Sequence, residues 1–196
     1  MPIGAAVLNP DNVLVGTSNG PGIWIAPVGT KAPADVNTVP ADPWQTLGYL
    51  SEDGVKVTQA TDSQNIMSWQ SKTPLRSFVT SREVSLEFTM LELSQRNFQL
   101  YFGQTISTGD PSEFSITVRG DEPAHHQYAV LLDLIDGDLI TRLFYPRASL
   151  SQAGDMEVTQ GGAIGLPVTM AAQDDNGVLV TMTRGKKTAP ATQAKQ

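Results

Sequence analysis

Apolar and polar residues alternate along most of the chain after Leu47, and this alternation constrains the fold more than any other feature. Successive side chains of a β-strand point to opposite faces, so a period of two predicts strands with one buried and one polar face. The clearest run places four apolar residues on one face: Val84, Leu86, Phe88 and Met90. Further alternating runs occupy residues 114–118, 128–134, 139–143, 164–170 and 178–182. The chain is therefore predicted to be mainly β.

Turn and helix signals complete this prediction. Asp53-Gly54, Asp136-Gly137 and Asn176-Gly177 lie between alternating runs, and such dipeptides supply the positive φ angles of tight hairpins. Residues 93–102 have helical spacing instead, with Ser94 as the N-cap and a stop at Gly103. We expect an antiparallel β-sandwich or barrel-like domain with one short α-helix.

The ends of the chain and one internal segment lack this periodicity. Residues 1–43 are rich in Pro, Gly and Asn and predict an extended N-terminal arm with one strand, whereas residues 185–196 predict a flexible C-terminal tail. The β domain then occupies residues 44–184, a normal size for one domain.

Residues 59–74 are polar and poorly periodic, which predicts a long loop within this domain. The segment nevertheless contains three large apolar residues: Ile66, Met67 and Trp69. Such a loop either docks on a neighbouring subunit or folds over its own core, and the residues alone leave both possibilities open.

Charge and composition argue against several classes of function. Thirteen Lys and Arg residues face 20 Asp and Glu residues, and the resulting net charge of −7 disfavours tight binding of nucleic acid. The chain has no cysteine, so disulfides, thiol catalysis and Cys-based metal sites are excluded. No apolar run matches a signal peptide or a membrane span. We expect no membrane anchor and assembly in the cytoplasm.

No motif predicts catalysis, a metal or a cofactor. His125 and His126 are adjacent, so on a strand they would point to opposite faces and could not chelate one ion together. The acidic residues at 133–138 surround a predicted turn and lack the ligand order of a calcium loop. The glycine-rich residues 16–22 precede a strand, so no helix N-terminus is available for a phosphate. No Gly-x-Ser-x-Gly elbow is present. We expect a protein that is not an enzyme.

Several motifs taken together resemble the major tail protein (the tail tube protein) of long-tailed, non-contractile bacteriophages. They are Gly-Tyr-Leu-Ser-Glu-Asp-Gly-Val at residues 48–55, Trp69, the strand and helix of residues 84–103, the strand at 139–148 that ends in Tyr-Pro-Arg-Ala, and Gly-Leu-Pro-Val-Thr-Met at residues 165–170. The resemblance extends over residues 48–184 and rests on the order and spacing of these motifs.

The resemblance implies a structural virion protein of the tail that joins into six-membered rings, which stack into a tube for genome delivery. The implied partners are further copies of the chain, a tape-measure protein, and tail-terminator or tip proteins. Viral DNA would pass through without tight binding, since an acidic wall gives no counterion-release gain. The candidate residues facing the lumen are Glu83, Ser85, Glu87 and Thr89. An acidic outer surface that keeps the protein soluble is the alternative.

Other functions fit parts of the same pattern. The tube of a contractile injection device and a head-completion ring are alternatives built on a related fold. A β-barrel that binds a small ligand belongs to another class and predicts a monomer with an apolar cavity. A glycan-binding virion domain is disfavoured because the chain has only three Trp residues. Polymerisation of the purified protein would favour the tube.

Overall fold

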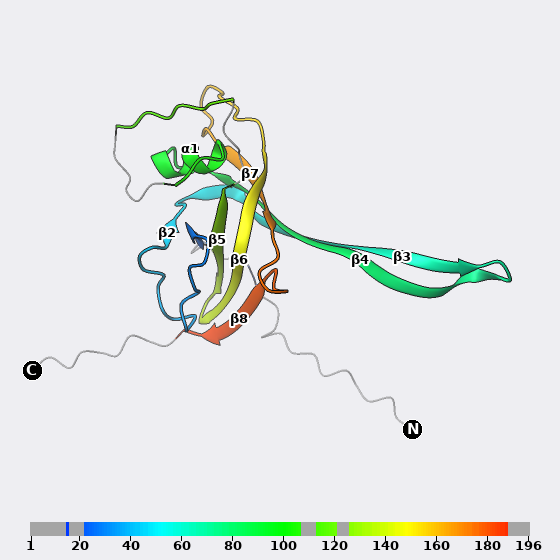
Figure 1. Ribbon diagram of the computed structural model, residues 1–196. Helices are drawn as coiled ribbons and strands as arrows, with labels where there is room; N and C mark the ends of the chain where they lie inside the picture. Colours follow the sequence, from blue (N-terminus) through cyan, green and yellow to red (C-terminus); the bar gives the residue numbers. More distant parts are fainter. Residues whose placement is uncertain (1–14, 16–21, 107–112, 121–125, 188–196) are drawn as a thin grey trace, which may run out of the picture.

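The computed structural model describes residue 15 and residues 22–106, 113–120 and 126–187. Within these ranges the chain forms one antiparallel sheet of eight strands and a single short helix (Figure 1). The strand order is β2-β1-β5-β6-β7-β4-β3, and β8 pairs with β6. The elements are β1 (Gly22–Pro27), β2 (Gln45–Thr46), β3 (Leu50–Ser68), β4 (Ser71–Met90), α1 (Gln95–Tyr101), β5 (Gln127–Asp136), β6 (Leu139–Ala153), β7 (Leu166–Ala172) and β8 (Thr181–Lys186). The predicted mainly antiparallel β fold with one helix is confirmed.

The two ends of the strand order are joined by a very short connection. β2 and β3 are separated by residues 47–49 alone. In this connection the Leu47 N–H donates to the Ile23 carbonyl (3.0 Å), and the Leu91 N–H donates to the Tyr49 carbonyl (2.9 Å). The connection therefore links β1 to the end of β4, and the sheet has a barrel-like form.

Gly48 permits this connection for two physical reasons. Its φ of 75° lies in the left-handed region that side chains disfavour. A Cβ at this position would also overlap the Glu92 carboxylate. That carboxylate accepts the Tyr49 N–H at 2.9 Å, so a larger residue at position 48 would displace a group that holds the connection in place.

The main hydrophobic core lies on one face of this curled sheet. The apolar residues of the 84–90 run are all buried, as the alternation predicts. Their main partners come from β1, β5, β6 and β7: Ile23, Ile25, Tyr128, Val130, Leu132, Tyr145, Leu166, Val168 and Met170. Burying a large aliphatic side chain contributes about 1.5–3 kcal/mol, so this cluster makes a large favourable contribution to folding.

Helix α1 has the predicted start and stop. The Ser94 side chain accepts a hydrogen bond from the Asn97 N–H (3.3 Å), and Gly103 follows the helix with a φ of 66°. Leu100 joins the core, and the buried Asn97 Nδ2 donates to the Leu47 carbonyl at 2.9 Å. The helix is therefore fixed to the connection between β2 and β3.

The one strand predicted in the N-terminal region is present as β1, but it is part of the sheet. Residues 22–27 do not belong to an arm, because β1 pairs with β2 and, over its whole length, with β5. The physical reason is that Ile23 and Ile25 are core residues, so the strand must lie within the sheet. Residues 1–14 and 16–21 of the predicted arm lie outside the described residues.

The predicted loop at residues 59–74 is instead the outer part of a long hairpin made by β3 and β4. Its pairing continues from Gln59 opposite Val84 to Ser68 opposite Ser71, with two shifts of register on the way. Both faces of this outer part are exposed, so its strands need no alternation of apolar and polar residues. For this reason the sequence of this part does not indicate strands. Asp53-Gly54 does not make a hairpin turn, because it lies within β3 where the register shifts between Leu50 and Val55.

The remaining turn predictions have mixed outcomes. Asp136-Gly137 connects β5 to β6, and Asn176-Gly177 forms a tight turn with φ angles of 54° and 85°. Both are confirmed. Residues 114–118 are irregular rather than a strand, and Phe114 contacts the ring of Phe98 on α1. β8 begins at Thr181 and includes the first two residues of the predicted tail, whereas residues 188–196 lie outside the described residues.

Candidate assembly surfaces

The β3–β4 hairpin projects far beyond the rest of the domain (Figure 1). Within the described chain, β7 pairs with β4 only from Ser85 to Met90, so the outer part of the hairpin has no third strand. An isolated two-stranded hairpin is at best marginally stable in water. The outer part of the hairpin therefore needs to pack against another protein surface.

The end of this hairpin is rich in exposed apolar side chains. Ile66 and Met67 lie near the end of β3, and Trp69 lies in the turn between the two strands with 99% of its surface exposed. Leu75, Phe78 and Val79 on β4 are exposed as well. Exposed apolar groups that gather at one place indicate an interaction site. The three residues singled out from the sequence thus lie together, at a hairpin tip rather than in a loop.

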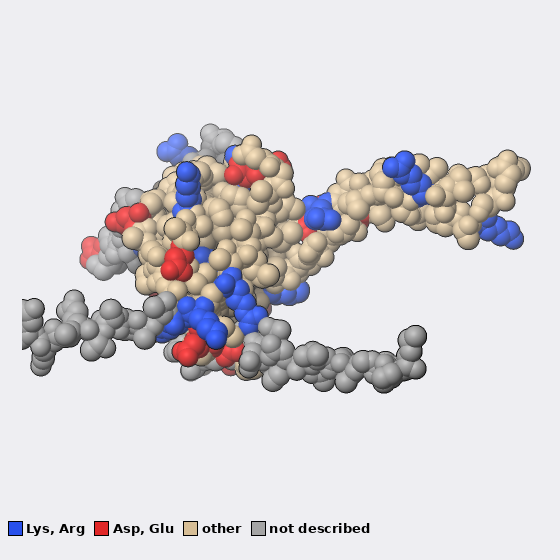
Figure 2. Space-filling view, turned by 90° about the horizontal axis from the view of Figure 1, so that it is seen from below, with Lys and Arg blue, Asp and Glu red and all other residues tan. Residues whose placement is uncertain are grey.

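The hairpin also differs from the body in charge. Residues 59–82 contain Lys72, Arg76 and Arg82 against the single acid Asp62, which gives +2; the rest of the chain therefore carries −7 − 2 = −9. Figure 2 shows isolated basic side chains along the hairpin and most of the visible acidic ones on the body. Attraction between unlike charges therefore favours contact of the hairpin with the body of another copy.

The predicted stripe of four residues lies on the face of β4 opposite the core. Glu83 and Glu87 are exposed, and Ser85 and Thr89 are partly exposed. The register extends this polar face to neighbouring strands, because Glu87 lies opposite Lys56 on β3 and Thr169 on β7. Small residues continue it: Thr58, Ala60, Pro167 and Ala171. This surface is a polar sheet face of small and acidic side chains.

Lys56 partly neutralises this polar sheet face. Its Nζ lies 3.0 Å from Oε2 of Glu87, and both side chains are largely exposed. Exposed ion pairs contribute about 0–1 kcal/mol, so this pair does little for folding. The pair does matter for charge, because Lys56 makes the polar sheet face less negative than the β4 residues alone would make it.

The same sheet face is covered over β1, β5 and β6. There Trp44 packs edge-on against Phe144, with ring centroids 6.2 Å apart, and joins a second small core with Ala129 and Leu131. The Trp44 Nε1–H donates to the Lys31 carbonyl at 3.2 Å, which ties down the segment between β1 and β2. The sheet face therefore has a covered half and an open half.

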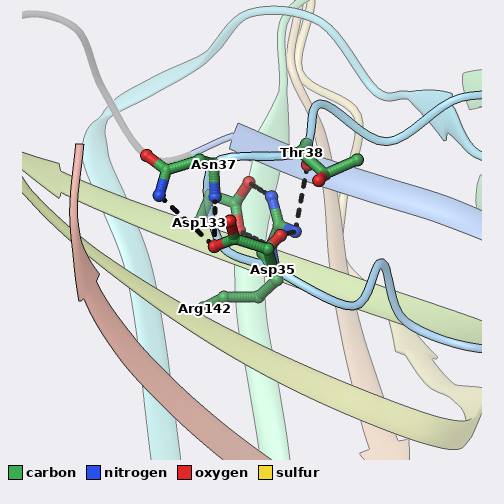
Figure 3. A network of polar contacts seen from close by, with 5 residues as sticks. All are labelled: Asp35, Asn37, Thr38, Asp133 and Arg142. Carbon is green, nitrogen blue, oxygen red and sulfur yellow. Dashed lines mark hydrogen bonds and ion pairs between the residues drawn. The ribbon is translucent and has the colours of Figure 1, made fainter. Parts of the chain in front are cut away.

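A buried ion pair holds the covering segment in place (Figure 3). Arg142 on β6 donates from Nε to Oδ1 of Asp133 (2.7 Å) and from Nη2 to Oδ2 (2.8 Å). Its Nη1 donates to the carbonyls of Asp35 (3.0 Å) and Thr38 (3.2 Å). Asn37 Nδ2 then donates to the Lys186 carbonyl on β8 at 3.1 Å. One guanidinium thus joins two strands to the covering segment, which in turn contacts β8.

The described residues offer little for catalysis. They contain no group of three or more His, Asp or Glu residues placed to hold a metal ion. Burial raises the pKa of Tyr145 to about 12 and that of Tyr128 further above its usual range, so both hydroxyls are neutral near pH 7. His126 lies at the entry to β5 with Nδ1 3.4 Å from Thr105 Oγ1, and His125 lies outside the described residues. Within the described ranges no helix has the length and apolar character needed to cross a membrane.

A filled β core, an uncovered hairpin and an open polar sheet face define a structural protein that acts through contacts with other proteins. The family model described as phage tail tube protein matches residues 6–193, which is nearly the whole chain. The chain belongs to this family and is a structural tail tube protein of a bacteriophage-type virion, not an enzyme. The family named from the sequence motifs is confirmed.

Solved structures with a similar chain were also found. One is a chain of the virion of a native gene transfer agent particle, with 11% identity, a TM-score of 0.44, and coverage of 86% of this chain and 99% of the other. A chain in the tail of an empty gene transfer agent particle has 11% identity, a TM-score of 0.42, and coverage of 90% and 98%. A chain of the anti-feeding prophage baseplate has 12% identity, a TM-score of 0.43, and coverage of 87% and 97%. Among curated proteins no match was found.

Proposed function

We propose that copies of this tail tube protein associate head to tail into six-membered rings, and that the rings stack into a tube through which viral DNA passes. The observation that carries this proposal is the projecting hairpin with its exposed apolar end. The hairpin and the body of the domain are different surfaces, so contact between them is heterologous and can close a ring or extend a filament. The number six rests on the family resemblance.

The hairpin residues Ile66, Met67 and Trp69 make the contact with the neighbouring copy in this proposal. Their exposure in the single chain supports it, since burial against a partner removes apolar surface from water. The difference between the net positive hairpin and the net negative remainder of the chain supports the same pairing. The alternative raised by the sequence, that these residues fold over their own core, disagrees with their position at the hairpin end.

The polar sheet face lines the bore in this proposal, with Glu83, Ser85, Glu87 and Thr89 directed at the lumen. Its support is that the face is open, lacks large apolar groups on β4 and carries two carboxylates. DNA near such a wall releases no counterions by contact and therefore slides without tight binding. Lys56 weakens the negative charge of this face. Its one positive charge is still outnumbered by the two carboxylates of Glu83 and Glu87.

The further partners are a tape-measure protein inside the tube and tail-terminator or tip proteins at its ends. Assembly takes place in the host cytoplasm before the tail joins the virion. The tube of a contractile injection device and a head-completion ring remain alternatives within the same structural class. A small-ligand barrel has less support, because core side chains fill the described interior.

Sedimentation velocity across a range of protein concentrations tests the proposal. Growth from monomers into large polymers with rising concentration is expected, because head-to-tail contacts propagate. A closed dimer whose size does not depend on concentration would contradict it.

A further inference from the structure

A small apolar hollow lies between the ends of β1, β2 and β5. It has a volume of about 160 Å³ and is lined mainly by Ile25, Pro27, Val28, Pro43, Ile106 and Tyr128. A cavity of about 150 Å³ is large enough to hold a benzene molecule. The hollow, called here the Gln45 hollow, therefore offers room for the apolar part of one aromatic side chain.

Two polar atoms of the residues around this hollow lack partners. Oε1 of Gln45 and Nε2 of His126 are both buried, and neither has a hydrogen-bond partner in the described structure. Buried polar atoms are nearly always hydrogen-bonded, and leaving one unpaired costs about 1–3 kcal/mol. An apolar group that also carries an N–H donor would fill the hollow and could supply the partner that Gln45 Oε1 lacks.

Trp69 has the chemistry that the Gln45 hollow lacks. An indole combines a large apolar ring with one N–H donor, and it has no acceptor to compete with Gln45 Oε1. At 99% exposure Trp69 is the most exposed large apolar side chain of the described residues. Its own chain gives the ring almost no contact, although Trp residues are typical anchors of interfaces.

The position of the hairpin excludes contact between Trp69 and the Gln45 hollow of the same chain. β2, which contributes Gln45, lies on one side of the domain, and the hairpin projects away from the opposite side (Figure 1). The donor and the acceptor therefore belong to different copies. Because the two surfaces differ, each copy can donate one Trp69 and accept another, which is the geometry of a repeating assembly.

We propose that Trp69 of one copy inserts its indole ring into the Gln45 hollow of the next copy and donates its N–H to Gln45 Oε1. This inference rests on the proposed self-assembly and names the receiving site for the hairpin. It commits to a second copy of this chain as the occupant. A small apolar molecule in the hollow is the competing occupant that the experiments below exclude or reveal.

Crosslinking tests the contact directly, because the natural chain has no cysteine. Gln70→Cys next to Trp69 and Val28→Cys at the hollow are combined in one chain, and the protein is polymerised and then oxidised. A ladder of disulfide-linked oligomers is expected on a denaturing gel. The matched control combines Gln70→Cys with Thr183→Cys, an exposed position on β8, and should give no ladder.

Fluorescence gives a second readout that does not depend on new residues. Trp44 is buried and Trp24 partly buried, so the change in emission on assembly should come from Trp69. A shift to shorter wavelength is expected in the natural protein and should be absent from Trp69→Phe. The phenylalanine variant keeps a ring but lacks the N–H, so it should need about fivefold more protein to polymerise.

Gln45→Leu tests the hydrogen bond alone. It should raise the polymerisation threshold about fivefold without lowering the melting temperature of the monomer, because it removes an unpaired buried oxygen. Gln160→Leu at an exposed position is the control and should leave the threshold unchanged. An unchanged threshold in Gln45→Leu would overturn the hydrogen bond that the inference requires.

The outcomes separate the inference from the proposed function. Polymers with the predicted ladder and emission shift support both. Polymers without a ladder, or with Trp69 still exposed to water, overturn the inference and leave self-assembly standing. Saturable binding of a small apolar molecule such as benzene to dilute monomers, measured by calorimetry, together with no change in Trp69 emission on polymerisation, identifies the competing occupant and overturns the inference. No polymers under any condition overturn both.

Discussion

Arg142 and Asp133 lie directly opposite each other on β6 and β5, and two hydrogen bonds of 2.7 and 2.8 Å join the guanidinium to the carboxylate. Both residues are almost completely buried. The same guanidinium bonds the carbonyls of Asp35 and Thr38, so the ion pair also holds the segment that covers half of the sheet face. This segment separates the covered half of the face from the open half that we assign to the bore.

Arg142→Met should lower the free energy of unfolding by about 3–5 kcal/mol, because Asp133 would remain as a buried and unpaired charge. The double variant Arg142→Met with Asp133→Leu should lose clearly less, and its remaining loss should come from the unpaired carbonyls of Asp35 and Thr38. Urea unfolding monitored by circular dichroism measures both. A double variant less stable than Arg142→Met alone would contradict this interpretation.

Tyr145→Phe and Tyr128→Phe should have different effects on stability. The Tyr145 hydroxyl is buried without a partner, so its removal should leave the stability unchanged or raise it by up to about 1 kcal/mol. The Tyr128 hydroxyl donates to the Gln104 carbonyl at 2.6 Å, so its removal should cost about 1 kcal/mol. Each variant is the size-matched control for the other, and equal losses in thermal unfolding would disagree with the structure.

The folded protein should lose stability between pH 10 and pH 12. Burial raises the pKa of Tyr145 from its usual value near 10 to about 12, so folding favours the neutral hydroxyl. This contribution is fully present below pH 10 and is lost as the pH rises towards the folded-state pKa. Urea midpoints measured from pH 8 to pH 12 should fall less steeply in Tyr145→Phe than in the natural protein, and parallel curves would contradict the assignment.

Replacing residues 60–83 by an Asn-Gly turn should remove the hairpin end without unfolding the domain. The pair Gln59 and Val84 would then flank the turn, and the buried residues from Val84 to Met90 would stay in place. The shortened protein should melt close to the natural temperature and should not polymerise.

Mixed with the natural protein, the shortened variant should end growing polymers, because it keeps the surface that receives a hairpin but has none to donate. Polymers imaged by electron microscopy should become shorter as its proportion rises. Unchanged lengths would mean that the hairpin does not connect the copies.

Glu83→Lys together with Glu87→Lys should leave polymerisation intact and change the charge of each copy by 2 × +2 = +4. If these residues face the bore, DNA should be held by a contact that weakens as the salt concentration rises. A phage with this change should adsorb normally and eject its genome poorly, measured by potassium efflux and genome entry. The control Glu113→Lys with Glu157→Lys changes exposed residues outside the stripe. Equal ejection by the two variants would place the stripe on the outer surface.

The parts of the fold that bury one face could be predicted from the sequence. Residues 84–90 alternate because their apolar side enters the core, and Ser94 and Gly103 bound the helix for local reasons. The outer hairpin was missed because neither of its faces is buried in the single chain, so its pattern resembles that of a loop. The strand at residues 22–27 was placed in an arm because its neighbours in the chain are rich in Gly and Pro.

The Arg142–Asp133 pair can be predicted from the sequence. The turn at Asp136-Gly137 fixes the hairpin register, and counting back from Asp136 opposite Leu139 places Asp133 opposite Arg142. The cluster of acidic residues near the turn indicates a turn and hides this cross-strand pair. The Gln45 hollow could not be found in this way, because it combines residues from four distant segments that only the folded chain brings together.

Electron microscopy of the concentrated purified protein tests the central claim most directly. Images averaged along and across the polymers give both the presence of a bore and the number of copies around it. We predict hollow tubes of uniform diameter with six copies in each ring. Closed dimers, or monomers at every concentration, would contradict self-assembly, and tubes with another ring number would contradict the sixfold ring.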